Sequence, residues 1–270
     1  MEPAQNMELT EEQIQRYARH IVLPEVGGEG QKKLINSRVL VVGAGGLGAP
    51  ILMYLAAAGV GTLGVIDDDL VELSNLQRQI IHTTERIGIP KIQSAAAAIA
   101  DINPNTNIIT HQYRLTRENA ISLTNNYDLI ADGSDNFETR FLINDACHFQ
   151  KKTLVSGAIL RFEGQIATFK SGVESDSPCY RCLYSDPPQT GLVPSCSDAG
   201  VLGALAGIVG SIQALEIIKE LIGIGASLSG SLIIYDALTS EQMKLQLKQN
   251  SNCKLCGDRP SITSVLTPSS

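Results

Sequence analysis

The stretch VLVVGAGGLGAP, residues 39–50, decides the fold. Its first four residues are apolar and predict a short buried strand, and Gly43, Gly45 and Gly48 then follow in the spacing G-x-G-x-x-G. Glycines at these positions permit a tight turn, and backbone N–H groups at the start of the next helix can bind phosphate oxygens. The strand, the turn and a helix over residues 49–58 therefore predict a nucleotide-binding unit.

A second strand follows at TLGVID, residues 62–67, and ends in Asp67. A carboxylate at this place can accept hydrogen bonds from both hydroxyls of a ribose. Both strands are apolar throughout, without alternation. Strands of this kind are typical of a parallel sheet that is covered on both faces.

Further segments continue the alternation of strands and helices. We expect strands at 107–113, 127–132, 153–159 and 164–170 and two more within 231–248, with helices at 9–21, 90–102, 139–149 and 199–223. Residues 171–198 are polar and rich in proline, which predicts a long functional loop. The expected fold class is α/β, with a Rossmann-like, doubly wound, mainly parallel sheet that continues into a mixed C-terminal sheet.

Composition limits the classes of function. The 270 residues carry a formal net charge of −7, which argues against nucleic acid or an anionic membrane as the main partner. The N-terminus has neither the basic region nor the apolar core of a secretory signal, so we expect a cytoplasmic protein. Polar residues interrupt the apolar run at 199–223, and this favours a buried helix over a membrane span.

A polar run, LSNLQRQ at residues 73–79, follows the acidic strand end. A nicotinamide site has little use for the cation Arg78, whereas a triphosphate would bind it. Lys91 lies in the first turn of a predicted helix, where the helix dipole disfavours a cation by about 0.3–1 kcal/mol; its ammonium therefore reaches either solvent or an anion. Asp135 offers a magnesium ligand near the phosphates, although SDN is also typical of a plain turn with an Asx cap. Together these residues favour a triphosphate with a metal ion.

Two C-x-x-C pairs predict a metal site. CYRC contains Cys179 and Cys182, and CKLC contains Cys253 and Cys256. One pair alone is also typical of a redox motif, but two pairs in a cytosolic protein favour zinc held by four thiolates. Such a site would be structural, joining the long loop to the C-terminal end.

The remaining two cysteines differ in context. Cys147 falls on an amphipathic helix, and we expect it in the core. Cys196 precedes a helix whose N-terminus can lower the pKa of a thiol, so a reactive thiol and an inert loop cysteine both fit. The four histidines form no catalytic motif.

These stretches together resemble the MoeB/ThiF/HesA family, relatives of the ubiquitin-activating enzymes, over about residues 10–257. The resemblance rests on RYARHIVLPEVG, GAGGLG, LSNLQRQ, GIPK, DGSDN, SGAILRFEGQ, CYRC, SCSDAGV and CKLCG in this order. It implies an adenylyltransferase that uses ATP and magnesium to adenylate the C-terminal glycine of a small ubiquitin-like sulfur carrier ending in Gly-Gly, with release of pyrophosphate.

The resemblance also implies roles for single residues. The expected nucleotide-binding residues are Gly43, Gly45, Gly46, Gly48, Asp67, Ser74, Asn75, Leu76, Gln77, Arg78, Lys91, Asp135 and Asn136. The expected catalytic residues are Arg19, Arg78, Lys91 and Asp135, with Asp135 holding magnesium and Cys196 as a candidate covalent thiol. Cys179, Cys182, Cys253 and Cys256 match the zinc ligands.

The resemblance implies partners as well. Arg19 matches an arginine that reaches the ATP site of the other subunit, which implies a homodimer with two composite sites. No rhodanese-like extension follows residue 257, so a separate sulfur donor protein is expected. Carboxylate attack on the α-phosphorus needs no general base, because the carrier terminus is already ionised at neutral pH.

For the domain organisation, we expect one adenylation domain over residues 1–258. Its nucleotide-binding half covers about 30–136, its carrier-binding and zinc half about 137–258, and a disordered tail 259–270. SGAILRFEGQ resembles the molybdopterin-synthase-activating branch of the family more than the thiamine branch. The resemblance therefore implies the molybdopterin-synthase carrier, with the thiamine-pathway carrier as the alternative. Two different classes of protein also stay open, an NAD-dependent oxidoreductase and a non-catalytic carrier-binding scaffold.

Overall fold

A single eight-stranded sheet organises the computed structural model, which describes residues 8–188 and 200–266. The strands lie in the order β3-β2-β1-β4-β5-β6-β7-β8. Their bounds are β1 Arg38–Val42, β2 Thr62–Ile66, β3 Asn107–His111, β4 Leu129–Asp132, β5 Thr153–Leu160, β6 Glu163–Phe169, β7 Ser231–Asp236 and β8 Glu241–Gln246. Strands β1 to β5 are parallel, whereas β6, β7 and β8 pair antiparallel. The expected mainly parallel sheet with a mixed C-terminal part is confirmed.

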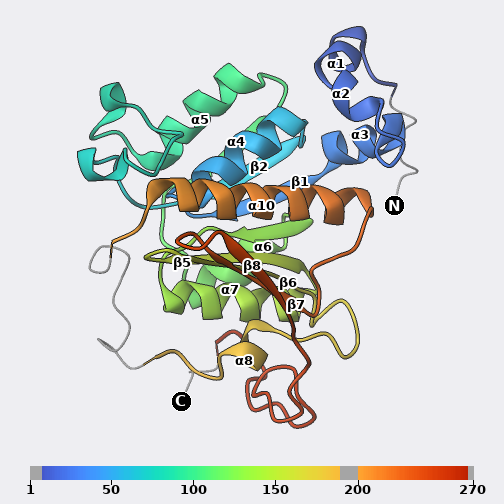
Figure 1. Ribbon diagram of the computed structural model, residues 1–270, viewed down its shortest axis with the longest axis vertical. Helices are drawn as coiled ribbons and strands as arrows, with labels where there is room; N and C mark the ends of the chain where they lie inside the picture. The colour runs from blue at the N-terminus through green and yellow to red at the C-terminus, as the bar shows by residue number, and fades with distance from the viewer. Residues whose placement is uncertain (1–7, 189–199, 267–270) are drawn as a thin grey trace.

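Helices cover both faces of the sheet. The helices of the described residues are α1 Glu11–Arg16, α2 Ala18–Ile21, α3 Gly27–Asn36, α4 Gly48–Ala58, α5 Lys91–Ile102, α6 Arg117–Thr124, α7 Phe137–Gln150, α8 Tyr180–Leu183 and α10 Gly203–Ile222, with short 3-10 turns η1 Leu73–Asn75 and η2 Thr84–Arg86. Figure 1 shows α4, α5 and α10 on one face and α6 and α7 on the other.

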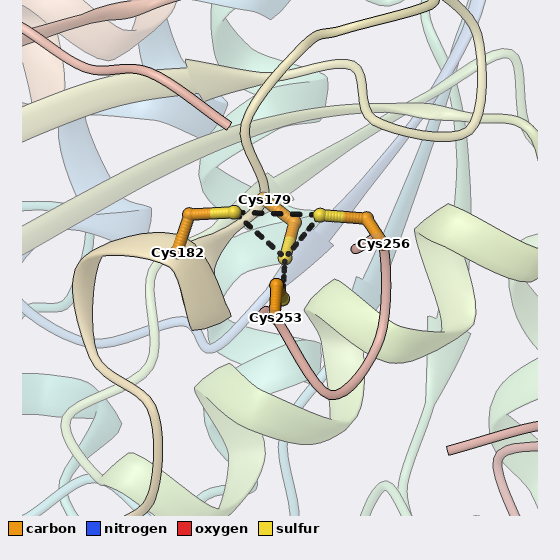
Figure 2. Close-up of side chains that lie close together, drawn as sticks. All are labelled: Cys179, Cys182, Cys253 and Cys256. Atoms are coloured by element: carbon orange, nitrogen blue, oxygen red, sulfur yellow. Dashed lines mark hydrogen bonds between the residues drawn. The ribbon is translucent and has the colours of Figure 1, made fainter. Parts of the chain in front are cut away.

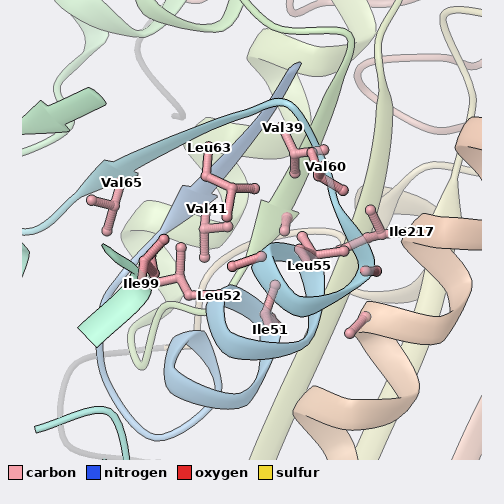
Figure 3. Packing of buried hydrophobic residues seen from close by; sticks show 14 of the residues in the cluster. Val39, Val41, Ile51, Leu52, Leu55, Val60, Leu63, Val65, Ile99 and Ile217 are labelled. Carbon is pink, nitrogen blue, oxygen red and sulfur yellow. The ribbon is translucent and has the colours of Figure 1, made fainter. Parts of the chain in front are cut away.

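Each strand supplies side chains to both cores, because successive residues point to opposite faces. On β1, Val39 and Val41 pack with Leu52 and Leu55 of α4 and Ile217 of α10 (Figure 3). Leu40 and Val42 lie in the opposite core, together with residues of α6 and α7. Burial on both faces of the sheet therefore explains why the sequence of β1 is apolar without alternation, as predicted.

The N-terminal segment differs from the single helix expected at 9–21. The helix starts with the capping box that its sequence indicates, in which Gln13 N donates to Thr10 Oγ1 and Thr10 N to Gln13 Oε1. It is interrupted at Tyr17, whose ring is buried and whose hydroxyl accepts a hydrogen bond from Asn103 Nδ2 at 2.9 Å. Packing of Tyr17 thus outweighs helix continuity.

Three helices, α3, α6 and α8, were absent from the sequence-based expectation, and the shortest of them, α8, lies within the loop expected at 171–198. Helix α3 begins with three glycines in four residues, which weakens its intrinsic signal, and it forms because Leu34 packs into the core beside Ile222 of α10. Helix α6 is short, but its capping box was readable: Thr116 N donates to Asn119 Oδ1 at 2.8 Å.

The C-terminal tail also differs from expectation up to residue 266. Ile262 is buried beside the cysteine cluster, and Val265 is buried in the core under α6. The carbonyl of Val265 accepts a hydrogen bond from Arg117 Nη1 at 2.8 Å. The tail was therefore wrongly expected to be disordered over 259–266, while residues 267–270 lie outside the described part.

The apolar run at 199–223 forms helix α10, as predicted from residue 203 onward. It packs against α4 and lies across β5 and β6. Within residues 8–188 and 200–266, no helix is long and apolar enough to cross a membrane.

Candidate functional site

A pocket runs along the carboxyl ends of strands β1 to β5. Because these strands are parallel, their carboxyl ends share one edge of the sheet, and the order of connection reverses between β1 and β4. A crevice at such a reversal is where open α/β sheets bind ligands. Residues from all five strand ends line the pocket, among them Gly43, Asp67, Tyr113, Asp135 and Ile159.

The glycine turn lies at the centre of the pocket. Gly43 has φ +94°, and a Cβ there would lie 2.8 Å from the carbonyl oxygen of Gly133. A Cβ at Gly48 would lie 1.8 Å from the carbonyl oxygen of Gly43. The first and third glycines are therefore required by the turn itself, while Gly45 and Gly46 line the pocket.

His82 holds the glycine turn by a hydrogen bond to its backbone. This role could not be seen in the sequence, where His82 belongs to no motif. Its Nε2 lies 2.9 Å from the carbonyl oxygen of Ala44, and its Nδ1 lies 2.8 Å from Ser94 Oγ. A carbonyl only accepts, so Nε2 carries the proton and Nδ1 accepts from Ser94. Burial lowers the pKa of His82, and the nearby cations Lys91 and Arg86 lower it further.

Asp67 is oriented by the backbone of the turn. Its Oδ2 accepts from Ala44 N at 2.8 Å, and its Oδ1 accepts from Asp69 N at 2.9 Å. Each carboxylate oxygen retains a second acceptor position, so two ribose hydroxyls can still bind. Burial raises the pKa of Asp67, and the charge of Lys91 opposes that rise.

Lys91 faces an anion rather than solvent. It lies at the start of α5, is buried, and its Nζ donates to Asp69 Oδ2 at 2.7 Å. Asp69 itself is two-thirds exposed, with a relative side-chain area of 66%. The sequence-based reasoning left both orientations open and did not select Asp69, although it lies in the same acidic run as Asp67.

The polar run 73–79 contributes fewer pocket residues than expected. Arg78 lines the pocket, and its Nη1 donates to the carbonyl oxygen of Ser74 at 3.1 Å. Asn75 instead closes its own turn, where its Oδ1 accepts from Glu72 N at 3.1 Å. Of the expected nucleotide-binding residues, those outside the pocket lining are Gly48, Ser74, Asn75, Leu76 and Gln77.

Gln79 is a pocket residue that the sequence-based reasoning missed. Its side chain is 3% exposed, and its Oε1 has no hydrogen-bond partner among the described residues. A buried acceptor without a partner is costly. The Nε2 of the same side chain lies beside Gly45 of the glycine turn. Its place at the end of the LSNLQRQ run was the available signal.

The structure of the SDN turn is compatible with both interpretations of its sequence, an Asx cap and a ligand for magnesium. Asn136 is the N-cap of α7, where its Oδ1 accepts from Thr139 N at 2.9 Å. Asp135 lines the pocket, and its only described contact is a long one of 3.4 Å from Asn136 Nδ2. The cap therefore leaves the carboxylate of Asp135 available to a cation.

Arg140, one turn into α7, is a buried cation in the pocket wall. Its Nη2 donates to the carbonyl oxygen of Ser134 at 3.0 Å, and its Nε lies 4.0 Å from Asp132 Oδ2. Asp132 is already bonded by the hydroxyls of Ser134 and Ser156, at 2.6 and 2.9 Å. Arg140 was also missed, because on sequence alone it reads as an ordinary helix residue.

The two C-x-x-C pairs come together, as predicted. Figure 2 shows the four thiols converging from α8 and from the C-terminal loop. The sulfur–sulfur distances are 3.9 Å (Cys179–Cys182), 3.6 Å (Cys179–Cys253), 3.4 Å (Cys182–Cys256) and 3.4 Å (Cys179–Cys256). A tetrahedron of sulfurs about 2.3 Å from one ion has edges of about 3.8 Å. The four cysteines can therefore hold one metal ion.

A buried ion pair fastens this cluster to α7. Arg181, inside CYRC, donates from Nε and Nη2 to the two carboxylate oxygens of Asp145, both at 2.7 Å. Next to it, Tyr180 N donates to Asn144 Oδ1 at 2.8 Å. Since α7 begins at the nucleotide pocket, one helix connects the pocket with the cysteine cluster.

Three further expectations concern residues outside the pocket. Arg19 lies on α2, is exposed and does not line the pocket of its own chain. Cys147 is buried in the core, as expected, and burial raises the pKa of its thiol. Cys196 lies outside the described residues.

Comparisons with known proteins agree with this geometry. The model of the ThiF family matches residues 17–255. A protein of Thermus thermophilus named sulfur carrier protein adenylyltransferase is 49% identical over 256 residues, covering 94% of each chain. A SAMP-activating enzyme E1 of Haloferax volcanii is 48% identical over 246 residues, which is 91% of this chain and 90% of that protein.

Among solved structures, the fold is similar to that of E. coli MccB crystallised with succinimide. The TM-score is 0.79 over 93% of this chain and 75% of that chain, at 18% identity. At this identity the likeness extends to the fold alone, and it agrees with the Rossmann-type sheet described above.

Proposed function

The chain belongs to the ThiF family, and on this premise we propose that it is an adenylyltransferase that activates a small ubiquitin-like sulfur carrier. The reaction joins the C-terminal glycine carboxylate of the carrier to the α-phosphorus of ATP and releases pyrophosphate. The names of the relatives with 49% and 48% identity support this class of reaction and substrate. The carrier acyl-adenylate then serves sulfur transfer from a separate donor protein.

The observation that carries the proposal is the pocket over the five strand ends. It combines a glycine turn, the carboxylates of Asp67 and Asp135, and the cations Arg78 and Lys91. The turn and the cations suit a chain of phosphates, and Asp67 suits a ribose. The described pocket lining contains no histidine, which fits a reaction whose nucleophile is already an ionised carboxylate.

Arg78 and Lys91 neutralise the charge that develops on departing pyrophosphate. Fixed cations act in this way because they need no reorganisation as the charge moves. Loss of one such contact typically raises the barrier by about 3 kcal/mol, or about a hundredfold in rate. Arg19 of a second copy completes the site in the proposed homodimer.

Two metal ions fit residues of this chain. Asp135 offers a carboxylate to magnesium beside the phosphates, and the ion would neutralise phosphate charge there. The four thiols of Cys179, Cys182, Cys253 and Cys256 suit zinc, which prefers four thiolates in structural sites. The cysteine centre lies at the far end of α7 and takes no part in the chemical step.

The molybdopterin-synthase carrier is the proposed substrate, with the thiamine-pathway carrier as the alternative. The segment SGAILRFEGQ, residues 156–165, favours the first. ATP–pyrophosphate exchange measured with each purified carrier separates them. Exchange that depends on one carrier identifies it, and exchange with neither contradicts the adenylation proposal.

An oxidoreductase would use the same glycine turn but would need NAD. ATP with magnesium, and not NAD, is expected to raise the melting temperature, by an amount that grows with ligand concentration. A rise with NAD alone would favour the oxidoreductase. A carrier-binding scaffold would respond to neither nucleotide.

A further inference from the structure

The turn between β5 and β6 lies at the rim of the pocket. Strand β5 is parallel to β4 and ends at the edge of the sheet where the pocket lies, and Ile159 near its end lines the pocket. Leu160 pairs with Glu163 across the hairpin, so the turn consists of Arg161 and Phe162 alone. These two residues therefore extend the sheet just beyond the pocket wall.

The backbone of the turn is strained at Arg161. Its φ is +54°, in the left-handed region, which costs a residue with a Cβ more free energy than it costs glycine. Two-residue hairpin turns need a positive φ at their first central residue and for this reason usually contain glycine there. Arginine thus occupies a position that glycine would fill with less strain. A side chain at a strained position indicates a function for that side chain.

The guanidinium group of Arg161 is available to a ligand. The residue is exposed, and within residues 8–188 and 200–266 no hydrogen bond or ion pair engages this group. Its N–H groups can therefore donate to a partner that approaches the rim.

Two other segments of the chain hold the turn in place. The amide of Ala237 donates to the carbonyl oxygen of Phe162 at 2.8 Å. On the other side, Arg161 forms a parallel β-bridge with Val201, which itself lines the pocket. The turn is thus fixed between the end of β7 and the segment that leads into α10.

Exposed apolar side chains belong to the turn and to both of these segments. Phe162 is 42% exposed, Leu238 71% and Leu202 51%. Leu238 and Leu202 directly follow the two residues that bond the turn. The rim of the pocket therefore combines an exposed cation with three exposed apolar side chains.

The chemistry of the proposed carrier fits this rim. Its tail ends in Gly-Gly, and two extended residues span about 7 Å. When the terminal carboxylate reaches the phosphates in the pocket, the first residue with a side chain lies about that far back, toward the rim. The glycines themselves offer only their backbone, whose carbonyl oxygens accept hydrogen bonds from a guanidinium group.

We propose that Arg161 is a specificity-determining residue that binds the extended C-terminal tail of the carrier at the rim of the pocket. Its guanidinium group donates to carbonyl oxygens of the tail, and Phe162 packs against an apolar side chain that precedes Gly-Gly. This proposal rests on the proposed function and adds to it the residues that recognise the tail of the protein substrate.

The kinetics of ATP–pyrophosphate exchange test the role of the side chain. In Arg161→Gly, the KM for the carrier that supports exchange should rise by about five- to tenfold, while the KM for ATP stays unchanged. The Tm should change by less than about 3 °C, because relief of the strained φ opposes the greater freedom of glycine in the unfolded chain. A merely structural role would change the Tm and leave the KM for the carrier as it is.

Lys151→Gly is the matched control. Lys151 is also an exposed cation with a positive φ, of +53°, but it caps the end of α7 that lies away from the pocket. Its substitution removes the same charge and a similar strain, and it should leave the KM for the carrier unchanged. Phe162→Ala should raise this KM, whereas Val173→Ala, at an exposed apolar residue after β6, should not.

Binding of a truncated carrier locates the contact. Calorimetry gives the Kd of the wild type and of Arg161→Gly for the intact carrier and for a carrier that lacks its last three residues. Truncation should weaken binding to the wild type by a larger factor than binding to the variant, because the variant has already lost the contact. Equal factors would mean that Arg161 does not bind the tail, and would overturn the proposal.

The outcomes separate this proposal from the proposed function. If the wild type catalyses exchange and Arg161→Gly has the same KM for the carrier, the contact at the rim is wrong and the function stands. An equal rise of this KM in Arg161→Gly and Lys151→Gly would be an effect of net charge and would also overturn the contact. If the wild type catalyses exchange with neither carrier, the proposed function fails and the contact fails with it.

Discussion

At the scale of the residue, Asp69 forms an ion pair with the ammonium group of Lys91. A triphosphate in the pocket would bind the same ammonium group. Lys91 is buried and bonded to Asp69 at 2.7 Å, and Asp69 remains largely exposed. The carboxylate therefore holds the Lys91 ammonium in place at the pocket wall. An incoming pyrophosphate group competes with this carboxylate.

The substitution Asp69→Asn should strengthen the binding of pyrophosphate. It removes the competing charge while leaving a side chain of the same size, and pairs of this exposure contribute up to about 1 kcal/mol. We expect the Kd for magnesium pyrophosphate to fall by about two- to fivefold at low salt. Calorimetric titration measures it.

Asp68→Asn is the control for net charge. Asp68 lines the pocket in the same acidic run, but the structure gives it no ion pair among the described residues. If the two variants change the Kd equally, the effect is one of overall charge, and the competition argument is wrong.

Sequence alone identified the residues whose chemistry depends on local pattern. Gly43, Asp67, Arg78 and Lys91 all line the pocket as expected. Gln79, Arg140 and His82 were missed, because their importance comes from contacts with segments far away in the chain. The expected role of Asn75 in nucleotide binding stays a prediction, and in the structure its Oδ1 bonds the backbone of its own turn.

At the scale of the element, His82 connects the loop after η1 with the glycine turn. Its folded pKa is lowered from the ordinary value, chiefly by burial. Between this folded pKa and about 6.5, the unfolded chain binds more protons than the folded one. His82 therefore contributes stability above pH 6.5 that is lost as the pH falls through the folded pKa.

The variant His82→Gln should show a flatter dependence of stability on pH. Glutamine can still donate to the carbonyl of Ala44 but does not titrate. We expect the free energy of unfolding of the wild type to fall more steeply than that of the variant between about pH 6.5 and pH 5. Urea unfolding across this range gives both slopes, and equal slopes would show that His82 is not the titrating group.

The Arg181–Asp145 pair is the second contact that acts between elements. Both side chains are almost fully buried, so removing one leaves an uncompensated charge. Arg181→Met should lower the free energy of unfolding by about 3–5 kcal/mol. Combining it with Asp145→Asn should recover a large part of the loss.

Lys254→Met provides the matched control for this pair. Lys254 bonds Asp186 at 2.8 Å in the same region, but both side chains are substantially exposed. The expected loss is below about 1 kcal/mol. Chemical unfolding of these variants measures the loss in free energy of unfolding. An equally small loss for Arg181→Met and Lys254→Met would contradict the argument from burial.

At the scale of the whole molecule, most of the fold could be predicted. Period and composition indicated strands β1 to β8. The pattern is clearest in β1, β2 and β4, which are apolar runs buried on both faces. Helix α3 and the packed tail at 259–266 could not be predicted in this way. Their order depends on contacts with α10, α6 and the cysteine cluster, which only the assembled chain provides.

Composite sites predict a specific pattern of complementation. If Arg19 acts in the partner's pocket, Arg19→Ala and Lys91→Met should each reduce carrier-dependent exchange by about a hundredfold. Co-expression of the two variants yields mixed dimers in which one pocket has both residues intact. Exchange should then return to about a quarter of the wild-type rate, by random assembly of two chain types.

Absence of recovery in verified mixed dimers would mean that Arg19 acts within its own chain or not at all. Arg16→Ala is a useful comparison, because Arg16 lies one turn earlier and already donates to the carbonyl of Ile102 within the chain. It should retain exchange activity.

Loss of the metal should affect stability more than chemistry. Cys253→Ser should reduce bound zinc from about one ion per chain to none and lower Tm by about 10 °C. Elemental analysis and thermal melts measure both quantities. Cys147→Ala should keep the zinc, since Cys147 is a core residue of α7, and full zinc content in Cys253→Ser would disprove the ligand assignment.

The cysteine cluster also bears on the order of events during synthesis. Cys179 and Cys253 are 74 residues apart, and closing a loop of that length costs about 4 kcal/mol of chain entropy. The strands and helices of residues 38–169 can pair while the ribosome still holds the C-terminal loop. We therefore expect the four-cysteine site to be completed only after Cys253 and Cys256 have been synthesised, so that a metal ion would join the middle of the chain to its C-terminal segment late in folding.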